Sequence, residues 1–282
     1  MTHVKIEEKK RNEEIEIHLL LEAINMKYGY DFRNYSSAHM KRRIVHRMNV
    51  ARLTSIAEMQ HKVIHDRDFF NTVLADFSIN VTEMFRDPSF YKAFREDVIP
   101  ILKTYPFIRI WHAGCSTGEE IYSMAILLQE EGLYHRTQIY ATDFNNLVLR
   151  KAKEGIYHID DIKEYTYNYQ QAGGKFSFSD YYIAKYDSVI FNPSLKQKIT
   201  FAEHNLVSDG VFGEMHVIIC RNVLIYFNKE LQDNVLKLFS DSLSNGCFLC
   251  LGSKESIKFS TISDSFKEFV SSEKIYQKKY LL

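Results

Sequence analysis

From residue 107 onward, short apolar runs alternate with segments that have the spacing of amphipathic helices. The apolar runs are 107–113, 138–142, 199–202, 216–220 and 247–251, and the helical segments are 118–131, 145–154 and 229–242. Strands that alternate with helices form a parallel sheet, and the helices cover both of its faces. The sequence therefore predicts an α/β domain on a doubly wound, mostly parallel sheet, with a last candidate strand at 274–281.

The first 80 residues follow a different pattern, with apolar residues at helical spacing and no sign of strands. Helical periodicity runs through 13–28 and ends at Gly29, and further helices are predicted at 37–53, 55–65 and 68–77. We therefore expect an all-α domain at 1–80, followed by the α/β domain at 81–282.

The stretch 156–198 interrupts the alternation of strands and helices. It contains a glycine pair at 173–174, followed by aromatic residues that alternate at Phe176 and Phe178. A glycine turn beside alternating aromatic residues is typical of a β-hairpin. We expect an inserted β-subdomain at 156–198 that is exposed to solvent.

Composition and charge exclude several classes of protein. Lys+Arg and Asp+Glu each number 36, so the net charge is zero and no overall field favours nucleic acid or an anionic membrane. The N-terminus lacks the apolar core of a signal peptide, and no apolar stretch approaches the roughly 18 residues that span a bilayer. The cysteines at 115, 220, 247 and 250 are then expected to be reduced. We expect a cytoplasmic protein with no membrane insertion and no metal, in which Cys247 and Cys250 belong to a buried strand.

The segment IWHAGCSTGEE at 110–120 predicts a strand, a glycine turn and the start of a helix. Ligands bind beside such turns in doubly wound sheets, and Gly114 would let the backbone approach a cofactor closely. The segment lacks the sequences of a phosphate loop and of a dinucleotide site. Glu119 and Glu120 would repel a pyrophosphate but attract a cation, which favours S-adenosylmethionine (SAM), a sulfonium with an amino group. An ordinary strand-to-helix turn is the alternative interpretation.

Polar residues also follow three later predicted strands. Asp143 could accept hydrogen bonds from ribose hydroxyls, the alternative being that it caps the next helix. Asn205 could bond to an adenine edge, and Asn222 and Val223 would lie beneath the reacting centre. The run at 220–227 lacks the Asn/Asp-Pro-Pro-aromatic sequence of nucleic-acid base methylases, so a nucleic-acid substrate is disfavoured.

Five short sequences resemble those of the chemotaxis receptor methyltransferases, the CheR family, and occur in the same order. They are NVTEMFRD at 80–87, GCSTGEE at 114–120, ATD at 141–143, HNL at 204–206 and CRNVLIYF at 220–227. The resemblance covers nearly the whole chain. It implies a class I SAM-dependent methyltransferase fold with a small N-terminal helical domain and an inserted β-subdomain. It also implies a protein-glutamate O-methyltransferase that converts SAM to S-adenosylhomocysteine.

The resemblance also assigns roles to residues at matching positions. The cofactor contacts that it implies are Asn80, Thr82, Arg86, Glu119 or Glu120 (with Glu120 favoured), Asp143, Asn205, Leu206, Asn222 and Val223. Arg86 and Tyr226 are placed nearest the transferred methyl group. No general base is needed, because a glutamate acceptor is already ionised at neutral pH. The enzyme then mainly aligns the acceptor, and Arg86 could orient its carboxylate with two hydrogen bonds.

The predicted helix at 37–53 is strongly basic, and no acidic residue occurs between Asp31 and Glu58. The basic residues that we assign to substrate binding are Lys41, Arg42, Arg43 and Arg47. Such a face would dock the glutamate-rich region of a chemoreceptor cytoplasmic domain or another glutamate-bearing signalling protein. A solvated cationic face is the alternative, and zero net charge disfavours RNA. The resemblance implies a monomer.

The chain departs from the best-known members of the family in two places. GSKES at 252–256 stands where they tend to carry a Gly-His-Ser-Glu-like stretch, and the insertion is longer and more aromatic around 170–192. In some members this subdomain binds a receptor tail peptide, and that role is left open here. Two other functions remain: a non-catalytic SAM-binding scaffold, and a methyltransferase for another substrate on the same fold.

Overall fold

The computed structural model describes residues 2–78 and 81–280, and the chain forms two compact units. The helical unit comprises Met1–Ile79 together with Ile225–Gln232, and the α/β unit comprises Asn80–Leu224 and Asp233–Leu282. Among the helices of the described residues, none is both long and apolar enough to cross a bilayer.

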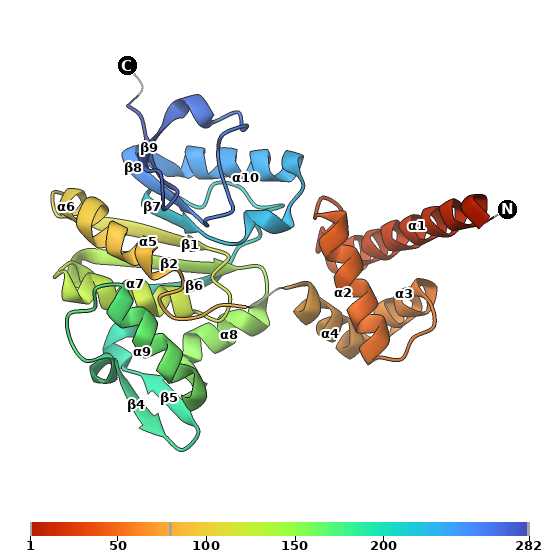
Figure 1. Cartoon of the computed structure of the whole chain (residues 1–282), viewed down its shortest axis with the longest axis horizontal. Coiled ribbons are helices and arrows are strands. Elements are labelled where there is room, and N and C mark those ends of the chain that lie inside the picture. The colour runs from red at the N-terminus through yellow and green to blue at the C-terminus, as the bar shows by residue number, and fades with distance from the viewer. Residues whose placement is uncertain (1, 79–80, 281–282) are drawn as a thin grey trace. The chain divides into compact units, whose positions relative to one another are not determined.

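The helical unit is built from amphipathic helices whose apolar faces meet. Its helices are α1 (Thr2–Tyr28), α2 (Ser37–Val50), α3 (Ile56–His65) and α4 (Arg67–Phe77), drawn in red to orange in Figure 1. Ser55 and Asp66 cap α3 and α4, because their side chains accept backbone N–H groups of the first turn. The buried core residues of this unit include Leu20, Ile24, Ile44, Met59, Val63 and Phe70.

Residues 225–232 belong to the helical unit although they are distant from it in sequence. The backbone N–H of Ser36 donates to the carbonyl oxygen of Tyr226 at 2.8 Å. The rings of Tyr35 and Phe227 pack edge to face, with their centroids 4.9 Å apart. The α1–α4 helices therefore hold the segment that carries Tyr226.

The α/β unit contains the predicted sheet. Its strands are β1 (Ile108–Ala113), β2 (Thr137–Asp143), β6 (Ile199–Glu203), β7 (Met215–Cys220), β8 (Leu243–Leu251), β9 (Phe266–Val270) and β10 (Ile275–Lys278), in the order β6-β2-β1-β7-β8-β10-β9. The pairs from β6 to β8 are parallel, whereas β10 is antiparallel to β8 and β9. The predicted fold class is thus confirmed; the sequence did not predict β9.

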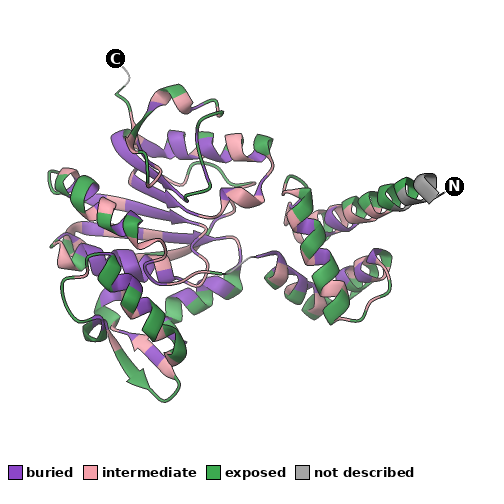
Figure 2. Cartoon of the chain, in the orientation of Figure 1, coloured by how far each residue is buried: buried purple, intermediate pink, exposed green. Residues whose placement is uncertain are grey.

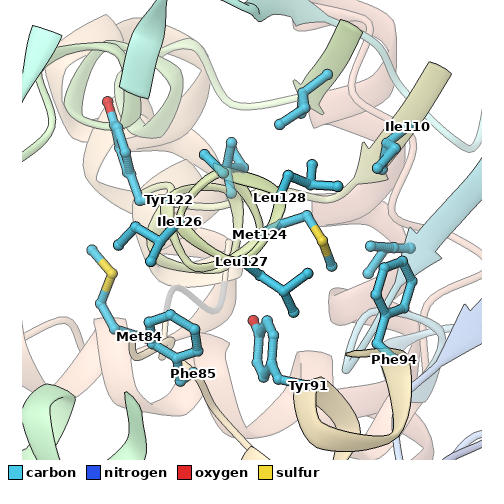
Figure 3. Close-up of a cluster of buried hydrophobic side chains, with 14 of the residues drawn as sticks. Met84, Phe85, Tyr91, Phe94, Ile110, Tyr122, Met124, Ile126, Leu127 and Leu128 are labelled. Atoms are coloured by element: carbon cyan, nitrogen blue, oxygen red, sulfur yellow. The ribbon is translucent and has the colours of Figure 1, made fainter. Parts of the chain in front are cut away.

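Helices cover both faces of this sheet, as alternating strands and helices require. The helices of this unit are α5 (Pro88–Ala93), α6 (Ile99–Leu102), α7 (Glu119–Glu130), α8 (Asn146–Glu154), α9 (Ile162–Gln171) and, from Asp233 onward, α10 (Lys229–Ser242). On one face, Ile110 joins a buried cluster with Met84, Phe85 and Leu127 of α7 (Figure 3). On the other face, Trp111 packs edge-on against Phe239 of α10.

The insertion forms a small antiparallel sheet of order β3-β5-β4, with α9 beside it. Its strands are β3 (Ile156–His158), β4 (Tyr182–Lys185) and β5 (Ser188–Phe191). The subdomain is exposed over part of its surface, as expected, but its aromatic residues are not, because Tyr169, Phe178 and Phe191 are buried in the main core cluster. The edge strand β4 is exposed along most of its length (Figure 2), and so are Ile156 and His158 of the other edge strand, β3.

Candidate active site

The turn that follows β1 is fastened to the end of β2. Gly114 and Cys115 both donate backbone hydrogen bonds to the carbonyl oxygen of Thr142, at 2.9 and 2.8 Å. Ser116 donates its N–H to the Asp143 carboxylate at 3.0 Å. Parallel strands end at the same edge of the sheet, so the glycine turn and the acid predicted from separate motifs lie side by side.

Asp143 is buried and accepts backbone hydrogen bonds from both directions along the chain. Its carboxylate accepts from the N–H of Ser116 and of Asn145, each at 3.0 Å. Burial raises the pKa of Asp143 to about 6, although these hydrogen bonds oppose the rise. The N-cap of α8 is Asn145, whose side chain accepts from the N–H of Leu147. The capping alternative for Asp143 is therefore wrong.

The turn after β7 approaches the Gly114 turn so closely that only a glycine fits. A Cβ on Gly114 would lie 2.7 Å from Cγ2 of Val223, and Gly114 has a φ of +78°. Asn222 also has a left-handed backbone, with a φ of +61°. The turns that carry Gly114, Asn222 and Val223 thus form one continuous surface beside Asp143.

Glu119 and Glu120 lie in different surroundings although they are neighbours on α7. Glu119 accepts a hydrogen bond from the Thr117 hydroxyl at 2.7 Å, and its burial raises its pKa to about 7. Glu120 lies 3.0 Å from Nδ1 of His112 and accepts from Arg221 at 3.3 Å. Burial alone would raise the pKa of Glu120, but His112 and Arg221 more than offset it and lower the pKa. Glu120 is therefore the more acidic of the two carboxyl groups.

Arg86 stands on a turn with unusual backbone geometry. The residues on either side, Phe85 and Asp87, have φ values of +52° and +55°, which non-glycine residues rarely adopt. The Arg86 guanidinium donates to the carbonyl oxygen of Val81 at 3.0 Å. Thr82, on the same segment, is partly exposed, and Asn80 lies outside the described residues.

The residues predicted after β6 form a local turn. Asn205 accepts the N–H of Val207 at 3.0 Å through its side-chain oxygen, which leaves its amide N–H₂ to point elsewhere. His204 donates its backbone N–H to the carbonyl oxygen of Asp143 at 3.3 Å, which ties this turn to the Asp143 loop. Asn205 and Leu206 are both partly exposed.

The remaining predicted residues belong to the helical unit. The ring of Tyr226 packs edge-on against His39 there, with centroids 5.3 Å apart. Lys41 pairs with Glu13 at 2.6 Å, and Arg47 pairs with Asp76 at 2.5 Å. The basic face of α2 is therefore less cationic than the sequence predicts, because acids from α1 and α4 neutralise two of its charges.

Two charged residues near these turns received no role from the sequence. Glu255 is buried, and its carboxylate accepts N–H bonds from Gly252, Asn222 and Val223 at 2.6, 3.0 and 2.9 Å. Arg221 directly follows the buried strand β7 and is itself buried. A charge at the end of a buried strand needs partners, and that signal could have singled out Arg221.

The chemistry of this edge suits SAM. A carboxylate has about four lone-pair positions, so Asp143 can still accept a bond from a ribose hydroxyl. The ionised Glu120 suits a cationic group. At Gly114 the space that a side chain would take is filled by Val223, so the glycine serves the packing of the two turns. Among the described residues, no group of His, Cys, Asp or Glu could hold a metal ion.

The order of the sheet and the polar residues at its carboxyl edge define a SAM-dependent methyltransferase. More narrowly, the chain belongs to the CheR methyltransferase family. The family model "CheR methyltransferase, SAM binding domain" matches residues 80–275, and "CheR methyltransferase, all-alpha domain" matches residues 15–78. The predicted family and cofactor are thus confirmed.

Two curated relatives are similar over most of their length. The "Putative methyltransferase Cher3" of Pseudomonas putida is 52% identical over 269 residues, which cover 95% of this chain and 98% of that protein. The "Chemotaxis protein methyltransferase" of Listeria innocua is 31% identical over 231 residues, which cover 81% and 85%. A weaker similarity, at 17% identity and a TM-score of 0.33, links 66% of this chain to 68% of the magnesium protoporphyrin IX methyltransferase of Synechocystis.

Replacement of Glu255 by glutamine should destabilise the α/β unit. Both carboxylate oxygens of Glu255 accept backbone N–H groups. Glutamine has only one acceptor oxygen, so its N–H₂ group would meet a backbone N–H, and these two donors cannot bond to each other. We expect the free energy of unfolding in urea to fall by about 1–3 kcal/mol. The exposed Glu96→Gln is the control and should change it by less than about 0.5 kcal/mol. Equal stability of the two variants would contradict the role of Glu255.

Proposed function

We propose that this chain transfers the methyl group of SAM to glutamate side chains of a chemoreceptor cytoplasmic domain or a related signalling protein in the cytoplasm. The observation that carries the proposal is the partly exposed Arg86, whose guanidinium is held by the carbonyl oxygen of Val81 and whose turn is joined through Arg221 to Glu120. There Arg86 would offer a cation to a carboxylate acceptor. The relatives named chemotaxis protein methyltransferases support the same substrate class.

Most of the predicted residues would bind the cofactor, each at a different part of SAM. Asp143 would accept the ribose hydroxyls, Asn205 and Leu206 would contact the adenine, and Glu120 would face the amino group. Gly114, Thr82, Asn222 and Val223 would line the remaining surface, with Glu119 behind them and Asn80 on the preceding segment. SAM supplies a methyl group on a positively charged sulfur.

The acceptor needs alignment rather than activation. An ionised glutamate oxygen would attack the methyl carbon, the bond to sulfur would break, and a methyl ester and S-adenosylhomocysteine would result. Opposite charges are neutralised in this step, so a site with little water favours it. Arg86 would orient the carboxylate, and Tyr226 would lie near the transferred group.

Replacement of Arg86 by alanine should lower methyl transfer to a receptor cytoplasmic fragment by about a hundredfold, because a fixed charge at the acceptor is lost. The measurement is base-labile label from methyl-labelled SAM, and the exposed Arg150→Ala on α8 is the control. A wild-type rate in Arg86→Ala would refute its role. SAM binding without transfer to any protein would favour a scaffold, and label in nucleic acid or small molecules would favour another substrate.

SAM affinity should depend on the protonation of Asp143. Burial raises the pKa of this carboxyl from 3.8 to about 6, so its charged form should be lost below that pH. Calorimetry should then show SAM affinity about tenfold weaker at pH 5 than at pH 7.

The folding stability of the cofactor-free chain should change with pH in the opposite direction. The raised pKa of Asp143 favours the folded chain at low pH, and this contribution to stability is lost as the pH rises through about 6.

Two variants assign this pH dependence to its source. Asp143→Asn should bind SAM weakly and without a pH dependence between 5 and 7, whereas Glu119→Gln should retain the dependence of the wild type. If Asp143→Asn keeps the wild-type profile, another group controls binding.

The exposed part of the basic α2 face would dock the acidic substrate. Lys41 and Arg47 are paired within the helical unit, and Arg43 is only partly exposed. We therefore choose Arg42, which is exposed and does not take part in these two ion pairs. Arg42→Glu should raise the KM for a receptor fragment by about two- to fivefold at low salt, and less at high salt. Arg11→Glu on α1 is the control. An unchanged KM in Arg42→Glu would assign docking to another surface.

A further inference from the structure

Arg221, which follows β7, connects the turn at 85–87 to the start of α7. Its guanidinium donates to the Asp87 carboxylate at 2.7 Å, to Glu120 at 3.3 Å and, through both terminal nitrogens, to the carbonyl oxygen of Arg86 at 3.2 Å. The side chain is 2% exposed, and it lies 4.2 Å over the ring of Phe90. A group buried this deeply cannot itself reach an acceptor protein.

The turn that Arg221 holds does not adopt its shape by local preference. Left-handed backbone costs roughly 1–2 kcal/mol for an ordinary residue, and both Phe85 and Asp87 adopt it. Such geometry persists only where the surroundings enforce it. Ser123 accepts the N–H of Phe85 at 2.8 Å, and Asn168 donates to the carbonyl oxygen of Met84 at 3.2 Å. Arg221 completes this clamp on the far side of the turn.

We infer that Arg221 is a positioning residue that holds the turn at 85–87 so that Arg86 meets the cofactor and the acceptor. The inference rests on the proposed role of Arg86. One planar guanidinium satisfies a carbonyl and two carboxylates at once, which a lysine ammonium, a single point charge, cannot reproduce. The same contacts hold Glu120 near the site, although Glu120 also keeps its contact with His112.

The chain contains a matched control for a merely structural ion pair. The Arg95 side chain is 7% exposed, donates to the carbonyl oxygen of Ala172 at 3.2 Å, and pairs with Glu130 and Glu131. These glutamates lie at the opposite end of α7 from Glu120. Arg95→Lys therefore removes the same kinds of bond far from the Arg86 turn.

The test is a double-mutant cycle on SAM affinity, measured by calorimetry with the full chain and no methyl acceptor. Arg221→Lys should weaken SAM binding about tenfold in the wild-type background but at most about threefold in Arg86→Ala, because the two residues act through one turn. Arg95→Lys should lower the melting temperature as much as Arg221→Lys does, yet leave SAM affinity within about twofold of the wild type.

The outcomes separate the two proposals. If Arg221→Lys weakens binding by the same factor in both backgrounds, or not at all, the positioning role is wrong. If Arg86→Ala alone leaves affinity unchanged, the cofactor role of Arg86 fails instead. Should Arg221→Lys not fold, Asn168→Ala releases the same turn without removing a charge, and its cycle with Arg86→Ala should show the same loss of additivity; additive losses would refute the clamp.

Discussion

The close approach of two turns at the carboxyl edge of the sheet is the constraint on which the rest of the candidate site depends. The turns leave β1 and β7, and no side chain fits between them at Gly114, because a Cβ there would lie 2.7 Å from Val223. Asn222 on the second turn has a left-handed backbone, and the buried Glu255 holds that turn by accepting hydrogen bonds from the N–H groups of Asn222 and Val223. Asp143 reaches this surface only because β2 pairs with β1 in register.

The charge of the two neighbouring glutamates at the start of α7 depends on where each side chain points. Successive side chains on a helix point about 100° apart, so Glu119 and Glu120 enter different surroundings although they are chemically identical. Glu119 meets a hydroxyl in a buried site and its pKa rises, whereas Glu120 meets His112 and Arg221 and its pKa falls. At this edge of the sheet, Glu119 is therefore a weak acid and its neighbour Glu120 is a carboxylate held in place by its partners.

The sequence failed to predict features that depend on partners from other parts of the chain. The alternating aromatic residues of the insertion fit an exposed hairpin as well as a buried one. Phe191 is buried against Tyr122 of α7, and Phe178 is buried against Phe85, and neither partner belongs to the insertion. The basic run of α2 contains no acid of its own, but Glu13 and Asp76 reach it from other helices. Within the described part of the chain, strand β9 pairs with β10 alone, which is the next strand in sequence, and the short sequence of β9 has no clear alternation.

The sequence by itself determined the main alternation of strands and helices after residue 107, the glycine and acidic residues at the ends of β1 and β2, and the CheR family. These features are encoded locally, in apolar periodicity and in short motifs, so they can be read without coordinates. Only the tertiary structure decided that Arg221 clamps Arg86 and Asp87, and that Glu255 holds Asn222. Those pairs are 134 or 135 and 33 residues apart, and residues so distant meet only when the folded sheet brings their turns to one edge.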